Sequence, residues 1–120
     1  MLATHNEVEA AITNPDWIIV DVRSGEDYIT RRIPGSVNMD WLNVLNTDMT
    51  FKPALTLRDI TLSKGITPDK NIIVYCNDGV KSSLVWFVLH ELLGYPVVKN
   101  YDGAFNQWLD LEKPVEITND

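Results

Sequence analysis

Two short runs of apolar, mostly β-branched residues constrain the fold more than any other feature, namely Trp17 to Val22 and Asn71 to Tyr75. Each run is continuous rather than alternating, which is typical of strands buried on both faces of a mostly parallel sheet. Segments with helical patterns lie between and around these runs. Because strand and helix alternate along the chain, we expect a layered α/β domain.

The expected helices have recognisable start and stop signals. Two capping pairs mark helix starts, namely Thr4 with Glu7 and Ser24 with Asp27. Lys52-Pro53 is typical of the first turn of a helix, and Gly65 and Gly94 are typical of helix ends. Residues 81–93 are apolar on almost every side. We therefore expect a helix there that is enclosed by the core, with Trp86, Phe87 and Leu89 buried.

Size, charge and apolar content limit the kind of protein. The 120 residues and 45% hydrophobic content suit one compact domain, which we expect to span residues 1–120. A formal net charge of -7 leaves no basic surface for a phosphate backbone, so nucleic acid is not expected as a partner. The longest apolar run, Leu84 to Leu89, is far shorter than the ~20 residues that span a bilayer, so no membrane partner is expected either.

The chain has one cysteine, Cys76, and two histidines, His5 and His90. One cysteine cannot form an internal disulfide, and the sequence opens without a basic and apolar leader, so we expect a cytoplasmic protein. The histidines are far from Cys76 in sequence and lack ligand spacing. We therefore expect neither a metal site nor a cofactor.

The segment from Tyr75 to Ser83 carries the chemistry, because it places Cys76 at the carboxyl end of a buried strand, before a short loop and a helix. Ligands bind at that end of open α/β sheets. The backbone N–H groups of residues 77–82 can surround the sulfur if Gly79 adopts a positive φ. The start of the helix and the Lys81 ammonium favour the thiolate, the nucleophilic form of cysteine. The alternative interpretation is an inert buried cysteine.

At this point the chain resembles a known family. The matching segments are IVDVRSGEDY at 19–28, RIPGSVNM at 32–39, YCNDGVKSSLVWFVLHELLGYP at 75–96 and VKNYDGAFNQW at 98–108. They occur in the order found in rhodanese-type sulfurtransferases, and the chain looks like the second, catalytic domain of tandem thiosulfate sulfurtransferases. The resemblance implies a rhodanese-like three-layer domain, in which a central, mostly parallel sheet is flanked by helices.

The resemblance also implies a reaction. Cys76 would take the outer sulfur of thiosulfate or a similar small anionic donor as a persulfide, and pass it to a thiol or to cyanide. The substrate-binding residues implied are Arg23 at the pocket mouth and the cradle of Asn77, Asp78, Gly79, Val80, Lys81 and Ser82. An ion pair with a surface carboxylate is the alternative role for Arg23. Asp21 is expected to hold loop backbone or a neighbouring arginine.

The chain departs from the family pattern after the cysteine, where relatives that use thiosulfate well commonly carry basic residues and this chain has Asn77 and Asp78. An inward Asp78 carboxylate would repel a dianion and disfavour the thiolate, whereas an outward one would orient backbone or contact a cationic partner. Lys81 stands where arginine is frequent and keeps the charge without the bidentate fork. Arg32 replaces a frequent histidine.

Three other functions compete with this one. A cysteine phosphatase or arsenate reductase on the same fold needs an arginine six positions after the cysteine, where this chain has Ser82. A non-catalytic binding module usually lacks the cysteine. A persulfide carrier that uses 3-mercaptopyruvate or a protein persulfide is kept open by Asp78.

In tandem relatives the pocket lies between two domains, so we expect an apolar rim near Trp41 and Phe105 that binds a second rhodanese domain or another copy.

Overall fold

The computed structural model describes residues 1–118. Its elements, in chain order, are α1 (His5–Ala11), β1 (Trp17–Asp21), α2 (Gly25–Thr30), β2 (Val37–Asn38), the 3-10 helix η1 (Trp41–Val44), α3 (Ala54–Ser63), β3 (Asn71–Tyr75), α4 (Val80–Phe87), the π-helical turn η2 (Val88–Leu92), β4 (Val98–Asn100) and α5 (Ala104–Asp110). Strand and helix alternate, as expected of an α/β domain.

The four strands form one parallel sheet in the order β2-β1-β3-β4. The two predicted strands are its central pair, β1 and β3, with Asp21 opposite Tyr75 at their carboxyl ends. Val22, the last residue of the first predicted run, lies just beyond β1, and its N–H still donates to the Tyr75 carbonyl. The edge strands β2 and β4 were not predicted, because two and three residues are too few to produce a recognisable apolar run.

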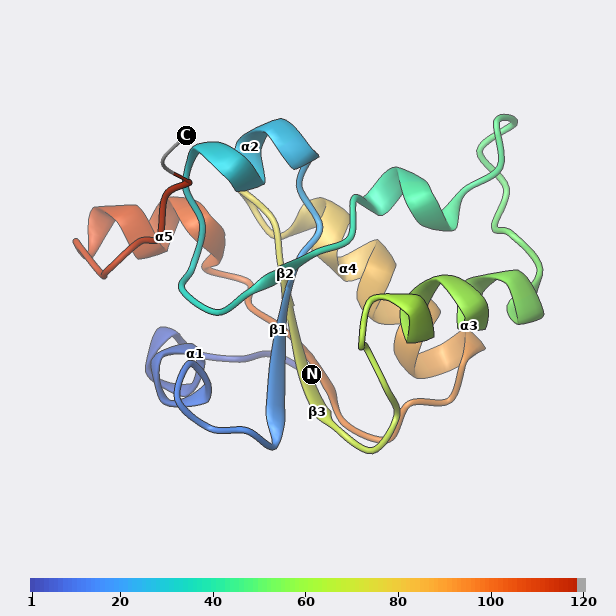
Figure 1. Ribbon diagram of the computed structural model, residues 1–120, viewed down its shortest axis with the longest axis horizontal. Coiled ribbons are helices and arrows are strands. Elements are labelled where there is room, and N and C mark those ends of the chain that lie inside the picture. The colour runs from blue at the N-terminus through green and yellow to red at the C-terminus, as the bar shows by residue number, and fades with distance from the viewer. Residues whose placement is uncertain (119–120) are drawn as a thin grey trace.

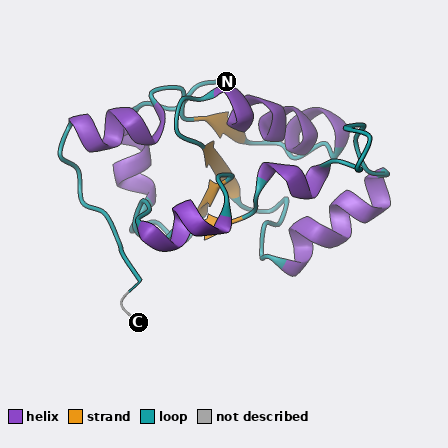
Figure 2. Cartoon of the chain, turned by 90° about the horizontal axis from the view of Figure 1, so that it is seen from above, coloured by secondary structure: helices purple, strands orange, loops and turns teal. Residues whose placement is uncertain are grey.

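Helices cover both faces of the sheet, which confirms the three-layer arrangement. Successive strand residues point to opposite faces, so Ile73 packs with α1 and α5, whereas Ile72 and Val74 pack with α3 and α4. Figure 1 shows α1 and α5 on one side of β1 and β3, and α3 and α4 on the other. Figure 2, seen from above, shows the sheet in the middle of the surrounding helices. Within residues 1–118, no helix is both long and apolar enough to cross a lipid bilayer.

Most predicted helix boundaries agree with the structure. Thr4 and Glu7 form the expected capping box of α1, and the Ser24 hydroxyl accepts the Asp27 N–H at the start of α2. The predicted helix at 81–93 is the continuous run of α4 and η2. Its expected enclosure is wrong for Phe87, which is 41% exposed and stacks on Phe51. The sheet covers one side of this run only, so its outer face remains in water.

Candidate active site

The site lies where β1 and β3 end, because parallel neighbours bring their carboxyl ends to the same edge of the sheet. Cys76 follows β3 directly, and its side chain is almost completely buried. Arg23 lies two residues beyond β1 and faces the same pocket. The adjacent strand ends thus bring together two residues that are 53 positions apart in the sequence.

Backbone N–H groups surround the sulfur, although fewer than the sequence suggested. Gly79 N lies 3.1 Å and Ser82 N lies 3.4 Å from Cys76 Sγ, each as a donor. The Val80 N–H donates instead to Asp78 Oδ1 at 3.1 Å. Both donors aimed at Sγ carry partial positive charge, and α4 begins in the same loop. This arrangement can stabilise negative charge on sulfur.

Gly79 makes the turn that forms the cradle. Its φ is +90°, in the left-handed region that glycine adopts without strain. A Cβ at this position would lie 2.9 Å from the backbone oxygen of Asp102. The loop around the sulfur therefore requires glycine both for its conformation and for its close approach to the segment after β4.

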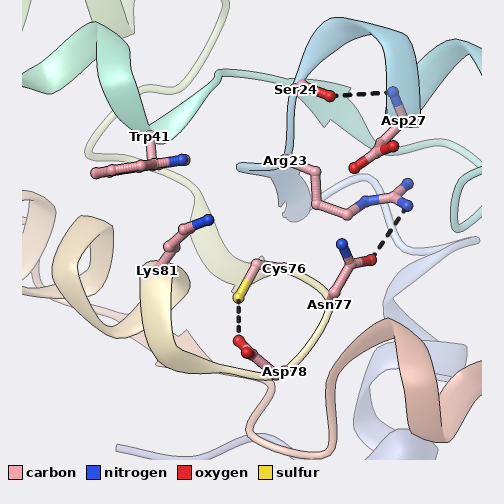
Figure 3. A pocket seen from close by; sticks show the side chains of 8 residues that line it. All are labelled: Arg23, Ser24, Asp27, Trp41, Cys76, Asn77, Asp78 and Lys81. Atoms are coloured by element: carbon pink, nitrogen blue, oxygen red, sulfur yellow. Dashed lines mark hydrogen bonds between the residues drawn. The ribbon is translucent and has the colours of Figure 1, made fainter.

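Asp78 points toward the sulfur, which answers a question that the sequence left open. Its Oδ1 lies 3.7 Å from Cys76 Sγ, and Figure 3 shows the carboxylate facing the thiol. A thiol at this position can donate its hydrogen to the carboxylate. An incoming anion meets a negative charge there.

Arg23 is buried, so an ion pair with a surface carboxylate is the wrong interpretation of this residue. Its Nε and Nη2 donate to the buried Asp21 carboxylate at 3.1 and 2.7 Å, and its guanidinium lies over the Phe105 ring at 4.2 Å. Its Nη1 lies 3.5 Å from Asn77 Oδ1 in the cysteine loop. Burial acts to lower the pKa of Arg23, but the hydrogen bonds and charge of Asp21 outweigh it and raise that pKa. Asp21 also accepts the Arg23 backbone N–H, as expected.

Tyr75 is a residue that sequence reasoning missed. Its hydroxyl donates to Asp21 Oδ2 at 2.7 Å and accepts the Ile33 N–H at 3.1 Å. Burial raises the pKa of Tyr75. The available signal was a tyrosine at the end of a buried strand, a position where its hydroxyl needs a polar partner. Through Asp21, Tyr75 helps to hold the Arg23 guanidinium under the cysteine loop.

A small cavity of about 120 Å³ opens beside the sulfur. It is smaller than the ~300–1,000 Å³ of pockets for drug-sized ligands, which limits a reactant to a small molecule or a narrow group. Its lining residues, drawn in Figure 3, are Arg23, Ser24, Asp27, Trp41, Cys76, Asn77, Asp78 and Lys81. The Lys81 side chain is exposed and lines this cavity, and its Nζ lies 5.0 Å from the centre of the Trp41 ring, so the cavity wall carries a cation.

The expected apolar rim differs from what the structure contains. Phe105 is only 2% exposed and lies beneath Arg23, so it cannot form an exposed rim. Trp41 is half-buried in the cavity wall, and its neighbour Leu42 is 50% exposed. Within residues 1–118, no group of three or more His, Cys, Asp or Glu side chains is arranged to hold a metal ion.

Comparison with known proteins gives consistent findings. A family model described as "Rhodanese-like domain" matches residues 4–111. A Haloferax volcanii protein named "Putative thiosulfate sulfurtransferase" is 40% identical over 98% of this chain and 46% of its own length. The "Sulfur carrier protein TtuD" of Thermus thermophilus is 44% identical over 78% of this chain and 38% of its own length. The chain thus spans less than half the length of these relatives.

Solved structures of EanB are also similar to this chain. The wild-type structure has a TM-score of 0.91 and 28% sequence identity, and covers 99% of this chain and 32% of its own. A variant of EanB described as a complex with ergothioneine covalently linked with a persulfide cysteine has a TM-score of 0.90, 29% identity and the same coverage.

Proposed function

The chain belongs to the rhodanese-like domain family, and on that premise we propose that it is a sulfurtransferase that carries a sulfane sulfur on Cys76 as a persulfide. The donor is thiosulfate or a similar small molecule, and the acceptor is a thiol or cyanide. The observation that carries this proposal is the Cys76 sulfur itself, which lies at a strand end with the Gly79 and Ser82 N–H groups directed at it. No cofactor is needed, because the sulfur atom is both nucleophile and carrier.

The reaction consists of two displacements at sulfur. The Cys76 thiolate attacks the outer sulfur of thiosulfate, the S–S bond of the donor breaks, and its electron pair leaves with sulfite. Cyanide then attacks the outer sulfur of the Cys76 persulfide, which yields thiocyanate and restores the thiolate. In this scheme the loop from Asn77 to Ser82 holds the anionic sulfur, and Lys81 attracts the donor from the cavity wall.

Arg23 has a different part in the proposal. Two of its donor atoms are committed to Asp21, and Nη2 also contacts the Arg31 carbonyl at 2.6 Å. Its Nη1 reaches the cysteine loop through Asn77. We assign Arg23 to two roles. From the cavity wall, its positive charge attracts the anionic donor. Its hydrogen bonds to Asp21 and Asn77 hold the cysteine loop in place.

A second candidate function, a persulfide carrier, is favoured by Asp78. A carboxylate 3.7 Å from the nucleophile opposes a dianion such as thiosulfate more than a thiol persulfide, which carries at most one charge at the reacting sulfur. In this case the Cys76 thiolate takes the outer sulfur of the donor persulfide, and the donor leaves as a thiolate. 3-Mercaptopyruvate, which has a single carboxylate, is a further donor; the Cys76 thiolate attacks its sulfur, the C–S bond breaks, and the electron pair leaves with the carbon as the enolate of pyruvate. One relative is named a sulfur carrier protein.

We also propose that residues 1–120 form one domain, and that this domain packs against a second rhodanese domain next to η1. The exposed Leu42 next to the cavity wall and the greater length of the relatives support this arrangement. Sedimentation of the isolated chain at high concentration tests the alternative, since a stable dimer would indicate self-association instead. The cytoplasm is the compartment we propose, because thiols stay reduced there.

Intact mass measurement tests the proposed chemistry. The native chain and Cys76→Ser are each incubated with thiosulfate, with an organic persulfide and with 3-mercaptopyruvate, and then treated with cyanide. We expect the mass of one added sulfur atom in the native chain, absent from Cys76→Ser and removed by cyanide. Loading by the persulfide alone would favour the carrier function, and no loading by any donor would indicate a non-catalytic binding module.

A further inference from the structure

The Ser82 hydroxyl lies between the nucleophilic sulfur and a buried amide from another strand. Ser82 Oγ is 3.4 Å from Cys76 Sγ and 2.6 Å from Oδ1 of Asn100, the last residue of β4. All three side chains are almost completely buried, with Asn100 only 6% exposed. The proposed reaction assigns no part to Asn100, although only the Ser82 hydroxyl separates its amide oxygen from the sulfur.

The hydrogen-bond partners determine where the Ser82 hydrogen lies. Asn100 Nδ2 donates to the Gly79 carbonyl at 3.3 Å. The opposite orientation of the amide would place two acceptor oxygens against each other, so Oδ1 must face Ser82. A carbonyl oxygen only accepts, and the Ser82 hydroxyl therefore donates its single hydrogen to Asn100.

This orientation has a consequence for the sulfur. With its hydrogen on Asn100, Ser82 Oγ presents lone pairs to Cys76 Sγ. A neutral thiol can donate a hydrogen bond to that oxygen, whereas a thiolate is repelled by the lone pairs of the oxygen. The hydroxyl can stabilise the thiolate only if its hydrogen turns away from Asn100, which leaves the buried amide oxygen without a donor.

We propose that Asn100 is a positioning residue that acts through the Ser82 hydroxyl to restrain the reactivity of the resting thiol. It does so by holding the hydroxyl hydrogen away from the sulfur, against the two N–H donors of Gly79 and Ser82 that favour the thiolate. The inference concerns the free cysteine, and it holds whether or not the chain transfers sulfur.

Several charged groups also face the sulfur or its loop, and they must stay constant in any test. Asp78, Lys81, Arg23 and Asp27 line the cavity, and the Asp102 side chain lies beside Gly79. A double-mutant cycle between residues 82 and 100 leaves all five groups unchanged. It separates an effect transmitted by the hydroxyl from a shift of the loop.

The experiment measures alkylation of Cys76 by iodoacetamide, an uncharged reagent, at one fixed pH below the titration midpoint of the thiol. The four proteins are the native chain, Asn100→Leu, Ser82→Ala and the double variant. We expect Asn100→Leu to raise the alkylation rate by about two- to tenfold in the native background, the range of one net hydrogen bond. In the Ser82→Ala background the same change should alter the rate by less than about twofold.

Two results would overturn the proposal. One is an unchanged or lower rate in Asn100→Leu, and the other is an equal rise in both backgrounds, which would place the effect in the Gly79 loop. Circular dichroism and thermal unfolding establish that each variant is folded. Asn100→Ala repeats the cycle with a smaller side chain if the leucine disturbs packing.

Discussion

Replacing Asp78 by asparagine isolates the negative charge that faces the Cys76 sulfur. Asp78 Oδ1 lies 3.7 Å from Cys76 Sγ and accepts the Val80 N–H at 3.1 Å. Asparagine has nearly the same shape and keeps an oxygen for Val80. The substitution therefore removes the charge and leaves the loop hydrogen bond in place.

The size of the expected effect follows from this distance. Two unit charges at 3.7 Å repel by about 1 kcal/mol in water and by about 4.5 kcal/mol at an effective dielectric constant of about 20. Asp78 is exposed, so the value near that of water applies. It corresponds to a factor of about six for each negative charge brought to the position of the sulfur.

We expect Asp78→Asn to raise kcat/KM for thiosulfate by about five- to tenfold, measured as thiocyanate formed from cyanide. The gain should shrink as salt is added, because counterions screen charges near the surface. Asp110→Asn is the matched control, since it changes the net charge equally at the end of α5, away from the cavity residues. Equal or lower kcat/KM in Asp78→Asn, or the same gain in Asp110→Asn, would refute the reasoning.

Three further substitutions test the residues that support the cysteine loop. Gly79→Ala should lower the free energy of unfolding by about 1–3 kcal/mol, measured by denaturant titration, because it combines a positive φ with a close contact to Asp102; wild-type stability would contradict this. Arg23→Leu should cost about 3–5 kcal/mol in the same measurement, since it leaves the Asp21 carboxylate buried without its cation; a loss below 1 kcal/mol would argue that water reaches Asp21. Tyr75→Phe should cost about 1–3 kcal/mol by removing a buried hydroxyl and its partners. Because folding raises the pKa of Tyr75, its stabilising effect is complete below the tyrosine pKa of ~10 of the unfolded chain and is lost as pH rises further. Above that pH, the free energy of unfolding should therefore fall less steeply with pH in Tyr75→Phe than in the native chain. Equal slopes in the two proteins would exclude this role.

Local signals in the sequence were enough to locate most of the elements. The apolar run at 71–75 is β3, and the Thr4–Glu7 pair is the capping box of α1. Such signals depend on neighbouring residues, whose backbone preferences and side-chain hydrogen bonds act over one turn or one strand. The strand, glycine loop and helix around Cys76 belong to the same class, which is why the sequence could place this cysteine at the end of β3.

Other features depend on which segments the fold brings together. The apolar pattern of 81–93 could not reveal which side of the helix the sheet would cover, and Phe87 lies on the uncovered side. Arg23 could not be distinguished from a surface residue until its partner, Asp21, was known to be buried. Burial of a charge is a property of the packed layers and not of the adjacent sequence.

The sequence by itself determined the fold class and the place of Cys76 at the carboxyl end of a buried strand, before a loop that contains Gly79. Only the tertiary structure decided that Asp78 faces the sulfur, and that Asn100 meets Ser82 although 18 positions separate them in the chain. The physical reason differs between the two, because the direction of the Asp78 side chain depends on the conformation of its own loop, whereas the contact between Asn100 and Ser82 depends on strand order. The β3·β4 pairing, with Val74 opposite Asn100, brings the end of β4 to the loop that follows β3. Side-chain hydrogen bonds across that junction then orient the groups around the sulfur.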